Sequence, residues 1–281
     1  MTKKNNNPRI ALVSMRPEIG HKEKNLKKMI TFLSQEEADL YIFGEAPVTG
    51  YRCKDELFRL AEPINGTTIT TLQHIASEKN ISIIFGMPLH HKKYKGVIQN
   101  SAIFIHPNKE VDTYQKWFLP TFGPFEEKLY FDEGEHLPVF TTPYGTIGIC
   151  ICYDLFFPEL MKAYAMKGVD MIICISASPN TSRKLFETLI PARAIENTVF
   201  FMFSNIVGPQ EDLVFWGGSQ IYDPLGKQLI KAPYFEESII TTTLDLSELP
   251  LIRQQRPTLR DTRPSLFYEL YQISKQQSIH H

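Results

Sequence analysis

Short apolar runs and amphipathic stretches alternate along the whole chain. Runs of β-branched and apolar residues predict strands, whereas apolar residues spaced three or four apart predict helices. The predicted strands are Ile10–Ser14, Leu40–Phe43, Ile81–Phe85, Ser101–Ile105, Val111–Gln115, Ile147–Cys152, Met171–Ile175, Val199–Val207, Gly218–Tyr222 and Ile239–Leu244. The predicted helices are Glu23–Leu33, Thr67–Glu78, Pro158–Met166, Ser182–Asn197 and a last one near Ser265–Ser274. This order predicts an α/β protein with helices covering strands that are numerous enough for two sheets.

We find no repeat, low-complexity stretch or linker that would divide the chain. We therefore expect a single domain over residues 1–281, with a C-terminal arm at about 250–281. The arm is basic and is marked by Pro257 and Pro264; it either clasps the domain surface or contacts a second subunit. Within the helix predicted at Ser182–Asn197, Pro191 is expected to cause a kink or to begin a second segment, because proline lacks the N–H that a helix requires.

Composition narrows the class of protein and its partners. Of the 281 residues, 43% are hydrophobic and 22% are charged, which is typical of globular proteins. A net charge of -1 provides no basic field for nucleic acid. Neither a secretory leader nor an apolar run of about eighteen residues is present, so we predict a cytoplasmic protein with no membrane partner. The four cysteines, Cys53, Cys150, Cys152 and Cys174, form no disulfide framework, which fits a reducing compartment.

The predicted strand that ends at Cys152 is the most informative segment for chemistry. An aromatic turn follows it, and Pro158 then stands where a helix can begin. Turns from a strand into a helix hold nucleophiles exposed beside backbone N–H groups. A lone cysteine in a strand is more often a buried structural residue, and we assign Cys150 and Cys174 to the core on that basis. Cys53 lies in a predicted loop, where it could be exposed, and receives no role.

Two charged residues also follow predicted strands. Glu45 comes just after Leu40–Phe43, and Lys116 comes just after Val111–Gln115. Strand ends of an α/β sheet gather at one edge, where ligands bind, so a Glu, a Lys and a Cys are expected in a common cleft. Taken singly, each of the two charged residues is more often solvated, so this expectation needs support from the surrounding sequence.

Three motifs follow one another along the chain, and two further segments accompany them. The motifs are Phe43-Gly44-Glu45 with Pro47 and Gly50, then Tyr114-Gln115-Lys116-Trp117-Phe118-Leu119-Pro120, then Gly148-Ile149-Cys150-Ile151-Cys152-Tyr153-Asp154 with Phe157-Pro158-Glu159. The further segments are Glu127-Lys128-Leu129-Tyr130-Phe131 with Gly134, and Ala192-Arg193-Ala194-Ile195-Glu196-Asn197 with Asn205 and Gly208. In this order they resemble the carbon–nitrogen hydrolase family, also called the nitrilase superfamily, over most of the chain.

The resemblance implies a fold and a set of roles. The fold would be a four-layer α-β-β-α sandwich. Cys152 would be the nucleophile, Glu45 the general base, and Lys116 the group that stabilises the tetrahedral oxyanion, together with the backbone N–H of Tyr153. Glu127 would be a second acid that positions the substrate and steers proton transfer. These roles suit the chemistry, because a thiol of pKa about 8.5 is mostly protonated at neutral pH and needs a base. No metal and no organic cofactor is implied.

The residues after the nucleophile favour one substrate class. Cys152-Tyr153-Asp154 is similar to the amidases and carbamoyl hydrolases of the family, whereas nitrile-cleaving members tend to carry Trp and Glu after the cysteine. We therefore expect a small linear amide or carbamoyl substrate, cleaved through a thioester with release of ammonia or an amine. The alternatives are nitrile hydrolysis, acyl transfer to an amine, or a non-catalytic binding protein on this fold. A papain-like protease would instead need a histidine beside Cys152.

Four residues are candidates for substrate contacts, and two segments for contacts between subunits. Tyr51, Trp117 and Tyr153 are aromatic residues in or near the motifs, although such residues are more often packing. Arg183 is a candidate partner for a substrate carboxylate, or else a solvated arginine on a helix. The segment from Ser176 to Arg183 lacks the tryptophan that many members carry there. The family resemblance also implies a homodimer or a larger assembly, through Pro158–Lys167 and Arg253–Tyr271.

Overall fold

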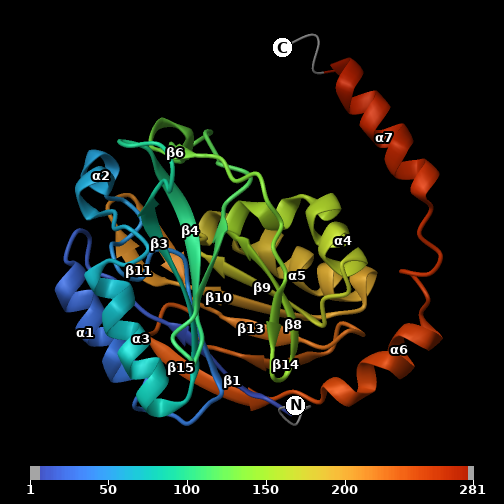
Figure 1. The fold of residues 1–281 in the computed structure, drawn as a ribbon, viewed down its shortest axis with the longest axis horizontal. Coiled ribbons are helices and arrows are strands. Elements are labelled where there is room, and N and C mark those ends of the chain that lie inside the picture. The colour runs from blue at the N-terminus through green and yellow to red at the C-terminus, as the bar shows by residue number, and fades with distance from the viewer. Residues whose placement is uncertain (1–6, 278–281) are drawn as a thin grey trace.

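Two β-sheets pack face to face at the centre of the molecule, and helices cover both outer faces (Figure 1). The structure is a computed structural model that describes residues 7–277. Its four layers confirm the α-β-β-α sandwich that the family resemblance implies.

Within residues 7–277, the first sheet has seven strands. The order across it is β15 (Ser238–Thr243), β1 (Arg9–Ser14), β2 (Leu40–Phe43), β3 (Ser82–His90), β4 (Ile98–Ile105) and β5 (Val111–Gln115), with β6 (Phe131–Asp132) paired to β4. Strands β1, β2 and β3 are parallel, the pairs β1–β15, β3–β4 and β4–β5 are antiparallel, and β6 runs parallel to β4. The carboxyl end of β2 therefore lies in the middle of the sheet, which is where the chain continues into Glu45.

Six strands form the second sheet in the same described range. Their order is β14 (Gln228–Lys231), β13 (Gln220–Tyr222), β10 (Phe200–Asn205), β9 (Met171–Ser176), β8 (Gly145–Ile151) and β7 (Phe140–Thr142). The central strands β8, β9 and β10 are parallel. A separate hairpin joins β11 (Val207–Gln210) to β12 (Leu213–Trp216). The carboxyl ends of β8, β9 and β10 consequently share one edge, where Cys152, Ser176 and Asn205 stand.

The alternation of side chains along each strand accounts for the layers. In β2, Ile42 points into the core between the sheets, while Phe43 packs under the helices outside the first sheet. Those helices are α1 (Lys22–Phe32) and α3 (Thr67–Lys79), and the second sheet is covered by α4 (Pro158–Met166) and α5 (Arg183–Asn197). The shorter helices are α2 (Leu57–Leu60), η1 (Lys54–Glu56), η2 (Glu127–Leu129), η3 (Cys152–Phe156), η4 (Asn180–Ser182) and η5 (Leu246–Glu248).

Three local features refine the picture drawn from the sequence. The strand predicted at Val199–Val207 is divided between β10 and β11. The helix α5 runs through Pro191 as one element, so no second segment begins there. Cys53 is buried rather than exposed, and its thiol donates a hydrogen bond to the carbonyl oxygen of Thr49 at 3.0 Å.

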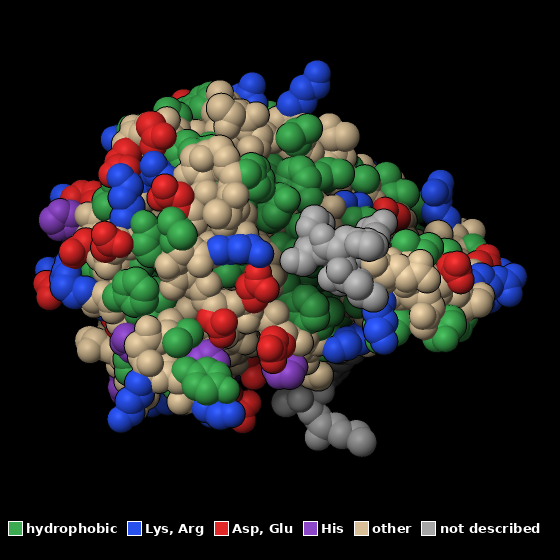
Figure 2. Space-filling model, turned by 90° about the horizontal axis from the view of Figure 1, so that it is seen from above, with side chains coloured by type: hydrophobic (Ala, Val, Ile, Leu, Met, Phe, Trp, Pro, Cys, Tyr) green, Lys and Arg blue, Asp and Glu red, His purple; other side chains and the backbone are tan. Residues whose placement is uncertain are grey.

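The C-terminal arm begins with α6 (Leu249–Gln255) and ends with α7 (Pro264–Gln277), which stands apart from both sheets (Figure 1). Apolar side chains of α7 are exposed, including Tyr268 and Leu270. On the face seen from above, hydrophobic side chains gather toward the middle (Figure 2). Positively and negatively charged side chains are mixed around them. None of the described helices is long and apolar enough to cross a bilayer.

Candidate active site

Glu45 lies where the edges of the two sheets meet, and two glycines make that position possible. A Cβ atom on Gly44 would lie 2.7 Å from the backbone nitrogen of Ile206 and 2.8 Å from the carbonyl oxygen of Ser176. A Cβ on Gly86 would lie 2.9 Å from the Cα of Glu45. Glycine is therefore needed for this close approach of backbones. The backbone N–H of Glu45 then donates to the carbonyl oxygen of Ser176 at 3.0 Å.

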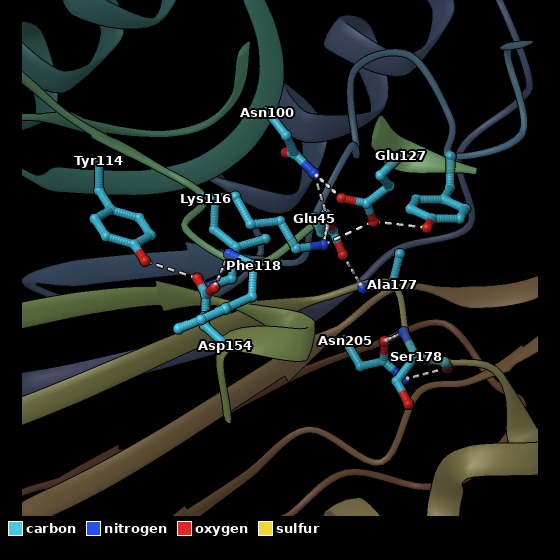
Figure 3. Close-up of polar contacts among 12 residues, drawn as sticks. Glu45, Asn100, Tyr114, Lys116, Phe118, Glu127, Asp154, Ala177, Ser178 and Asn205 are labelled. Atoms are coloured by element: carbon cyan, nitrogen blue, oxygen red, sulfur yellow. Dashed lines mark hydrogen bonds and ion pairs between the residues drawn. The ribbon is translucent and has the colours of Figure 1, made fainter. Parts of the chain in front are cut away.

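Lys116 follows β5 and lies buried between two carboxylates (Figure 3). Its Nζ donates to Oε1 of Glu45 at 2.9 Å and to Oε1 of Glu127 at 2.7 Å. Asn100 of β4 donates from Nδ2 to Oε1 of Glu45 at 2.7 Å, and the Tyr51 hydroxyl donates to Oε1 of Glu127 at 2.7 Å. Buried charges are tolerated when they are paired and hydrogen-bonded in this way. We call Glu45, Asn100, Lys116 and Glu127 the charged centre.

The two carboxylates of the charged centre differ in their surroundings. Oε2 of Glu45 accepts the backbone N–H of Ala177 at 2.9 Å, which ties this carboxylate to the second sheet. Burial raises the pKa of Glu127 to about 7; Lys116 opposes that rise and Glu45 adds to it. Burial alone would lower the pKa of Lys116, but Glu127 and Glu45 outweigh it and raise that pKa above the ordinary lysine value. Lys116 is thus a fixed cation, and Glu127 changes its charge near neutral pH.

Cys152 directly follows β8 and opens η3, at the strand-to-helix turn that the sequence predicts. Its φ of 48° is left-handed, a conformation that residues other than glycine adopt rarely and at a cost. The side chain is almost buried, with 8% of its residue surface exposed. Burial and the Glu45 carboxylate raise the pKa of the Cys152 thiol well above its usual value, although Lys116 lowers it. A thiol with a raised pKa is protonated at neutral pH, and a protonated thiol requires a base before it can act as a nucleophile.

Asp154 joins the turn at Cys152 to the loop that follows Lys116. Its Oδ2 accepts hydrogen bonds from the Tyr114 hydroxyl at 2.7 Å and from the backbone N–H of Ile151 at 2.9 Å, and its Oδ1 accepts the backbone N–H of Phe118 at 3.0 Å (Figure 3). Burial raises the pKa of Asp154 to about 6, against the effect of Lys116. The carboxylate thereby fixes the end of β8 relative to the end of β5.

Two of the predicted substrate contacts lie beside these groups. Tyr51 touches Glu127 through its hydroxyl, so it borders the charged centre. Tyr153 follows Cys152 directly, and its ring packs against Phe122 and Phe157 with centroids 5.3 Å and 5.2 Å away. The rings of Phe122, Tyr153 and Phe157 therefore pack together next to the turn at Cys152.

The other two predicted contacts have partners of their own. The indole Nε1 of Trp117 donates to the carbonyl oxygen of His136 at 2.9 Å, so the ring is held against that loop. The Arg183 guanidinium lies 4.8 Å from the centroid of the Tyr234 ring. Its charge helps to lower the pKa of Glu187, whose carboxylate pairs with Lys231 at 2.6 Å. Arg183 is therefore not a freely solvated arginine.

Sequence reasoning missed one member of the charged centre. Asn100 stands just before a predicted strand and belongs to none of the motifs, so its polar side chain gave no signal. In the structure it contacts both carboxylates, with the longer bond reaching Oε2 of Glu127 at 3.4 Å. Asp154 was part of a motif, but its three partners come from distant segments, so its linking role required the folded chain.

Together, the edge of the two sheets holds a thiol, two carboxylates and an ammonium, which are the groups that acyl transfer to sulfur uses. Within residues 7–277, no group of three His, Cys, Asp or Glu side chains is arranged to hold a metal ion. A sandwich fold with this constellation defines an α/β hydrolytic class with a cysteine at a strand end. The chain belongs to the carbon–nitrogen hydrolase family, whose model matches residues 9–254.

Relatives within the family carry several activities in their names. A probable nitrilase of Schizosaccharomyces pombe is 30% identical over 93% of this chain and 97% of its own. The glutamine-dependent NAD(+) synthetase of Aquifex aeolicus is 29% identical over 85% of this chain, which spans 42% of that longer protein. An amidase of Nesterenkonia sp. AN1, solved as a mutant with the acetamide moiety of fluoroacetamide added at the active-site cysteine, matches with a TM-score of 0.80 and 25% identity over 93% of this chain and 95% of that one.

Proposed function

We propose that this protein hydrolyses a non-peptide C–N bond of a small amide or carbamoyl compound through a thioester on Cys152. The observation that carries the proposal is the buried Lys116 ammonium, held between the Glu45 and Glu127 carboxylates at the sheet edge that also bears the thiol. Nucleophile, base and oxyanion-stabilising cation are all side chains of this chain. The proposed reaction therefore needs no metal or organic cofactor.

In the acylation half, Glu45 accepts the proton of Cys152 as the sulfur attacks the carbonyl carbon. The carbonyl π electrons move to oxygen, and the Lys116 ammonium and the backbone N–H of Tyr153 stabilise that oxyanion. When the oxyanion reforms the carbonyl, the C–N bond breaks and the leaving nitrogen takes the proton from Glu45. Ammonia or an amine departs, and the acyl group remains on sulfur.

In the deacylation half, Glu45 removes a proton from water and the resulting hydroxide attacks the thioester. A second oxyanion forms at the same place, and its collapse expels the sulfur, which recovers its proton from Glu45. Glu127 is proposed to position the substrate nitrogen and to steer these proton transfers. Its hydrogen bond from Lys116 and its near-neutral pKa support that role, since a group titrating near the working pH exchanges protons readily.

An amide is the favoured substrate class. The Cys152-Tyr153-Asp154 sequence supports it, and so does the Nesterenkonia relative, an amidase whose cysteine takes up an acetamide group. Tyr51, Trp117 and Tyr153 are proposed to line the substrate pocket. Arg183 is proposed to pair a substrate carboxylate, because stacking over Tyr234 orients its planar guanidinium, while the neighbouring Glu187 carboxylate is paired with Lys231.

We also propose that the protein forms a homodimer or a larger assembly of its own chain through the C-terminal arm. The support is the exposed apolar surface of α7, where Tyr268 is 66% and Leu270 is 49% exposed. Exposed apolar patches of this kind typically mark contact surfaces. A second copy offers the same patch, so the contact can be self-complementary.

The proposal is tested by measuring ammonia release from small amides, ω-amides such as glutamine, carbamoyl compounds and nitriles. The control is the Cys152→Ala variant, which deletes one sulfur and is expected to keep the fold while it loses turnover by at least about a thousandfold. Release that depends on Cys152 from one group of compounds would assign the substrate class. Comparing the amount of free acid formed in water with the amount of new amide formed when an acceptor amine is added separates hydrolysis from acyl transfer. Turnover by Cys152→Ala at the wild-type rate would refute the nucleophile.

A further inference from the structure

Ser176 is the last residue of β9, and its side chain has no partner of ordinary hydrogen-bond geometry. The residue is fully buried, and its hydroxyl makes no hydrogen bond of ordinary geometry within the described chain, although it lies close enough to Cys152 to lower the pKa of that thiol. Buried hydroxyls are nearly always paired, because an unpaired one loses its bonds to water without replacement. An orphan of this kind therefore marks either a role in chemistry or a partner that appears only during the reaction.

The hydroxyl of Ser176 belongs beside the nucleophile by strand register. In the parallel pair of strands β8 and β9, Ile151 stands opposite Ile175. The residues that follow them, Cys152 and Ser176, are therefore neighbours. The backbone of Ser176 is already fixed, since its carbonyl oxygen accepts the N–H of Glu45 at 3.0 Å and that of Ile206 at 3.1 Å. The backbone of Ser176 is thus hydrogen-bonded to Glu45, the proposed base. The Ser176 hydroxyl remains available to donate a hydrogen bond to the thiol.

We propose that the Ser176 hydroxyl donates a hydrogen bond to the sulfur of Cys152 when the thiol loses its proton to Glu45. This inference rests on the proposed function of Cys152 as the nucleophile. A neutral thiol is a weak acceptor, whereas a thiolate is a strong one, so the contact gains strength as negative charge develops on sulfur. An interaction that is stronger in the transition state than in the ground state accelerates the reaction. Ser176 keeps its own proton throughout.

The charges around the thiol explain why such a donor is useful. Burial and the Glu45 carboxylate raise the pKa of Cys152, whereas the Lys116 ammonium and the Ser176 hydroxyl lower it. The Lys116 ammonium also pairs with the Glu45 and Glu127 carboxylates, so the sulfur is not its only partner. The titratable side chains that interact with the thiol are Glu45, Tyr51, Lys116, Cys150 and Cys174. Ser176 adds a neutral donor that does not compete with these charges.

The test is the pH dependence of alkylation of Cys152 by iodoacetamide in the full chain, with the modified peptide assigned by mass spectrometry. For Ser176→Ala we expect the alkylation rate at neutral pH to fall about tenfold to a hundredfold, since a bond to a charged group is lost. The midpoint of the pH profile should move to higher pH. On the preferred amide, kcat should fall by a similar factor with KM unchanged. The free energy of unfolding should stay the same or rise, because the removed hydroxyl had no partner.

Two variants sharpen this test. Ser176→Thr keeps a hydroxyl donor and should restore most of the alkylation rate. Ser204→Ala is the matched control, because Ser204 is equally buried but its hydroxyl donates to the carbonyl oxygen of Ile42 at 2.9 Å. That variant should lose stability and keep the wild-type alkylation profile.

Several outcomes would overturn the proposal. A Ser176→Ala protein with an unchanged alkylation profile would show that the hydroxyl does not serve the sulfur. A change in KM alone would make Ser176 a substrate contact instead. Destabilisation or unfolding of Ser176→Ala would reveal a structural partner. The proposed function fails separately, and only if Cys152→Ala keeps its turnover.

Discussion

The charged centre and the turn at Cys152 are neighbours, yet they are built in opposite ways. In the charged centre, Glu45, Lys116 and Glu127 each have at least two hydrogen-bond partners. At the turn, Cys152 holds a left-handed backbone and the adjacent Ser176 has an unpaired hydroxyl. One region is complete before any substrate arrives, and the other is left strained and incomplete.

This difference matches the two tasks that the proposed reaction sets. Stabilising an oxyanion requires charges that are oriented in advance and need no reorganisation, which a fully bonded network supplies. Forming and breaking a bond to sulfur requires a nucleophile whose partners change during the reaction. The strain at Cys152 persists because Asp154 over-determines the turn with three hydrogen bonds. Variants that affect the charged centre and the turn at Cys152 differently therefore test whether the two regions have these separate roles.

The largest expected effect comes from Glu127→Gln, which removes one ionisable group from the charged centre and keeps its shape. Turnover should fall roughly a hundredfold to ten-thousandfold, the range for loss of a positioned proton-transfer group. Alkylation of Cys152 should change far less, because the sulfur keeps Glu45. The matched control is Glu126→Gln, a change of the exposed neighbouring residue. Steady-state turnover of both variants checks the prediction, and a fully active Glu127→Gln would demote Glu127 to a structural residue.

Next in size is the effect of Lys116→Met on stability. Removing the cation leaves two carboxylates in a buried site, which costs about 3–5 kcal/mol in comparable buried pairs. Urea unfolding at pH 7 should report a loss of that order. Lys128→Met is the control, because its ion pair with Glu133 is exposed and contributes little. Equal losses for the two variants would show that the charged centre is not the paired network described above.

A residue's place in the site can be predicted from the sequence when the segments that mark it lie nearby in the chain. Glu45 and Lys116 come just after predicted strands and Cys152 ends one, and strand ends meet at one edge. The resemblance of the surrounding motifs to the carbon–nitrogen hydrolase family then singled these three residues out. Their burial was not predictable, since charged residues at strand ends are usually solvated. Asn100 and the orphan hydroxyl of Ser176 depend on contacts across the two sheets. Periodicity and motifs carry no information about such contacts.

A smaller effect is expected in the pH dependence of stability. The pKa of Glu127 is raised by burial to about 7 in the folded chain, while a glutamate in an unfolded chain titrates near 4.3. Between these values the folded state binds the extra proton, so this group's contribution to stability falls as pH rises, and is fully present only below the unfolded pKa. Relative to Glu127→Gln, the wild type should therefore lose about 1–3 kcal/mol of unfolding free energy from pH 4.5 to pH 7. A flat difference between the two proteins would mean that Glu127 is ionised throughout.

The smallest effect on the fold is expected at α7, which lies outside both regions. Leu270→Gln should weaken association of the chain about tenfold or more by sedimentation, because it removes the burial of one leucine in the proposed contact. Its unfolding free energy should change by less than about 0.5 kcal/mol, as for other exposed positions. Glu269→Gln creates the same residue type at the adjacent exposed position and should leave association intact. A monomeric wild type would contradict the assembly. If turnover fell in step with dissociation, the site would depend on the partner chain to hold the strained turn at Cys152. The contrast between that turn and the charged centre would then be a property of the assembly and not of one chain.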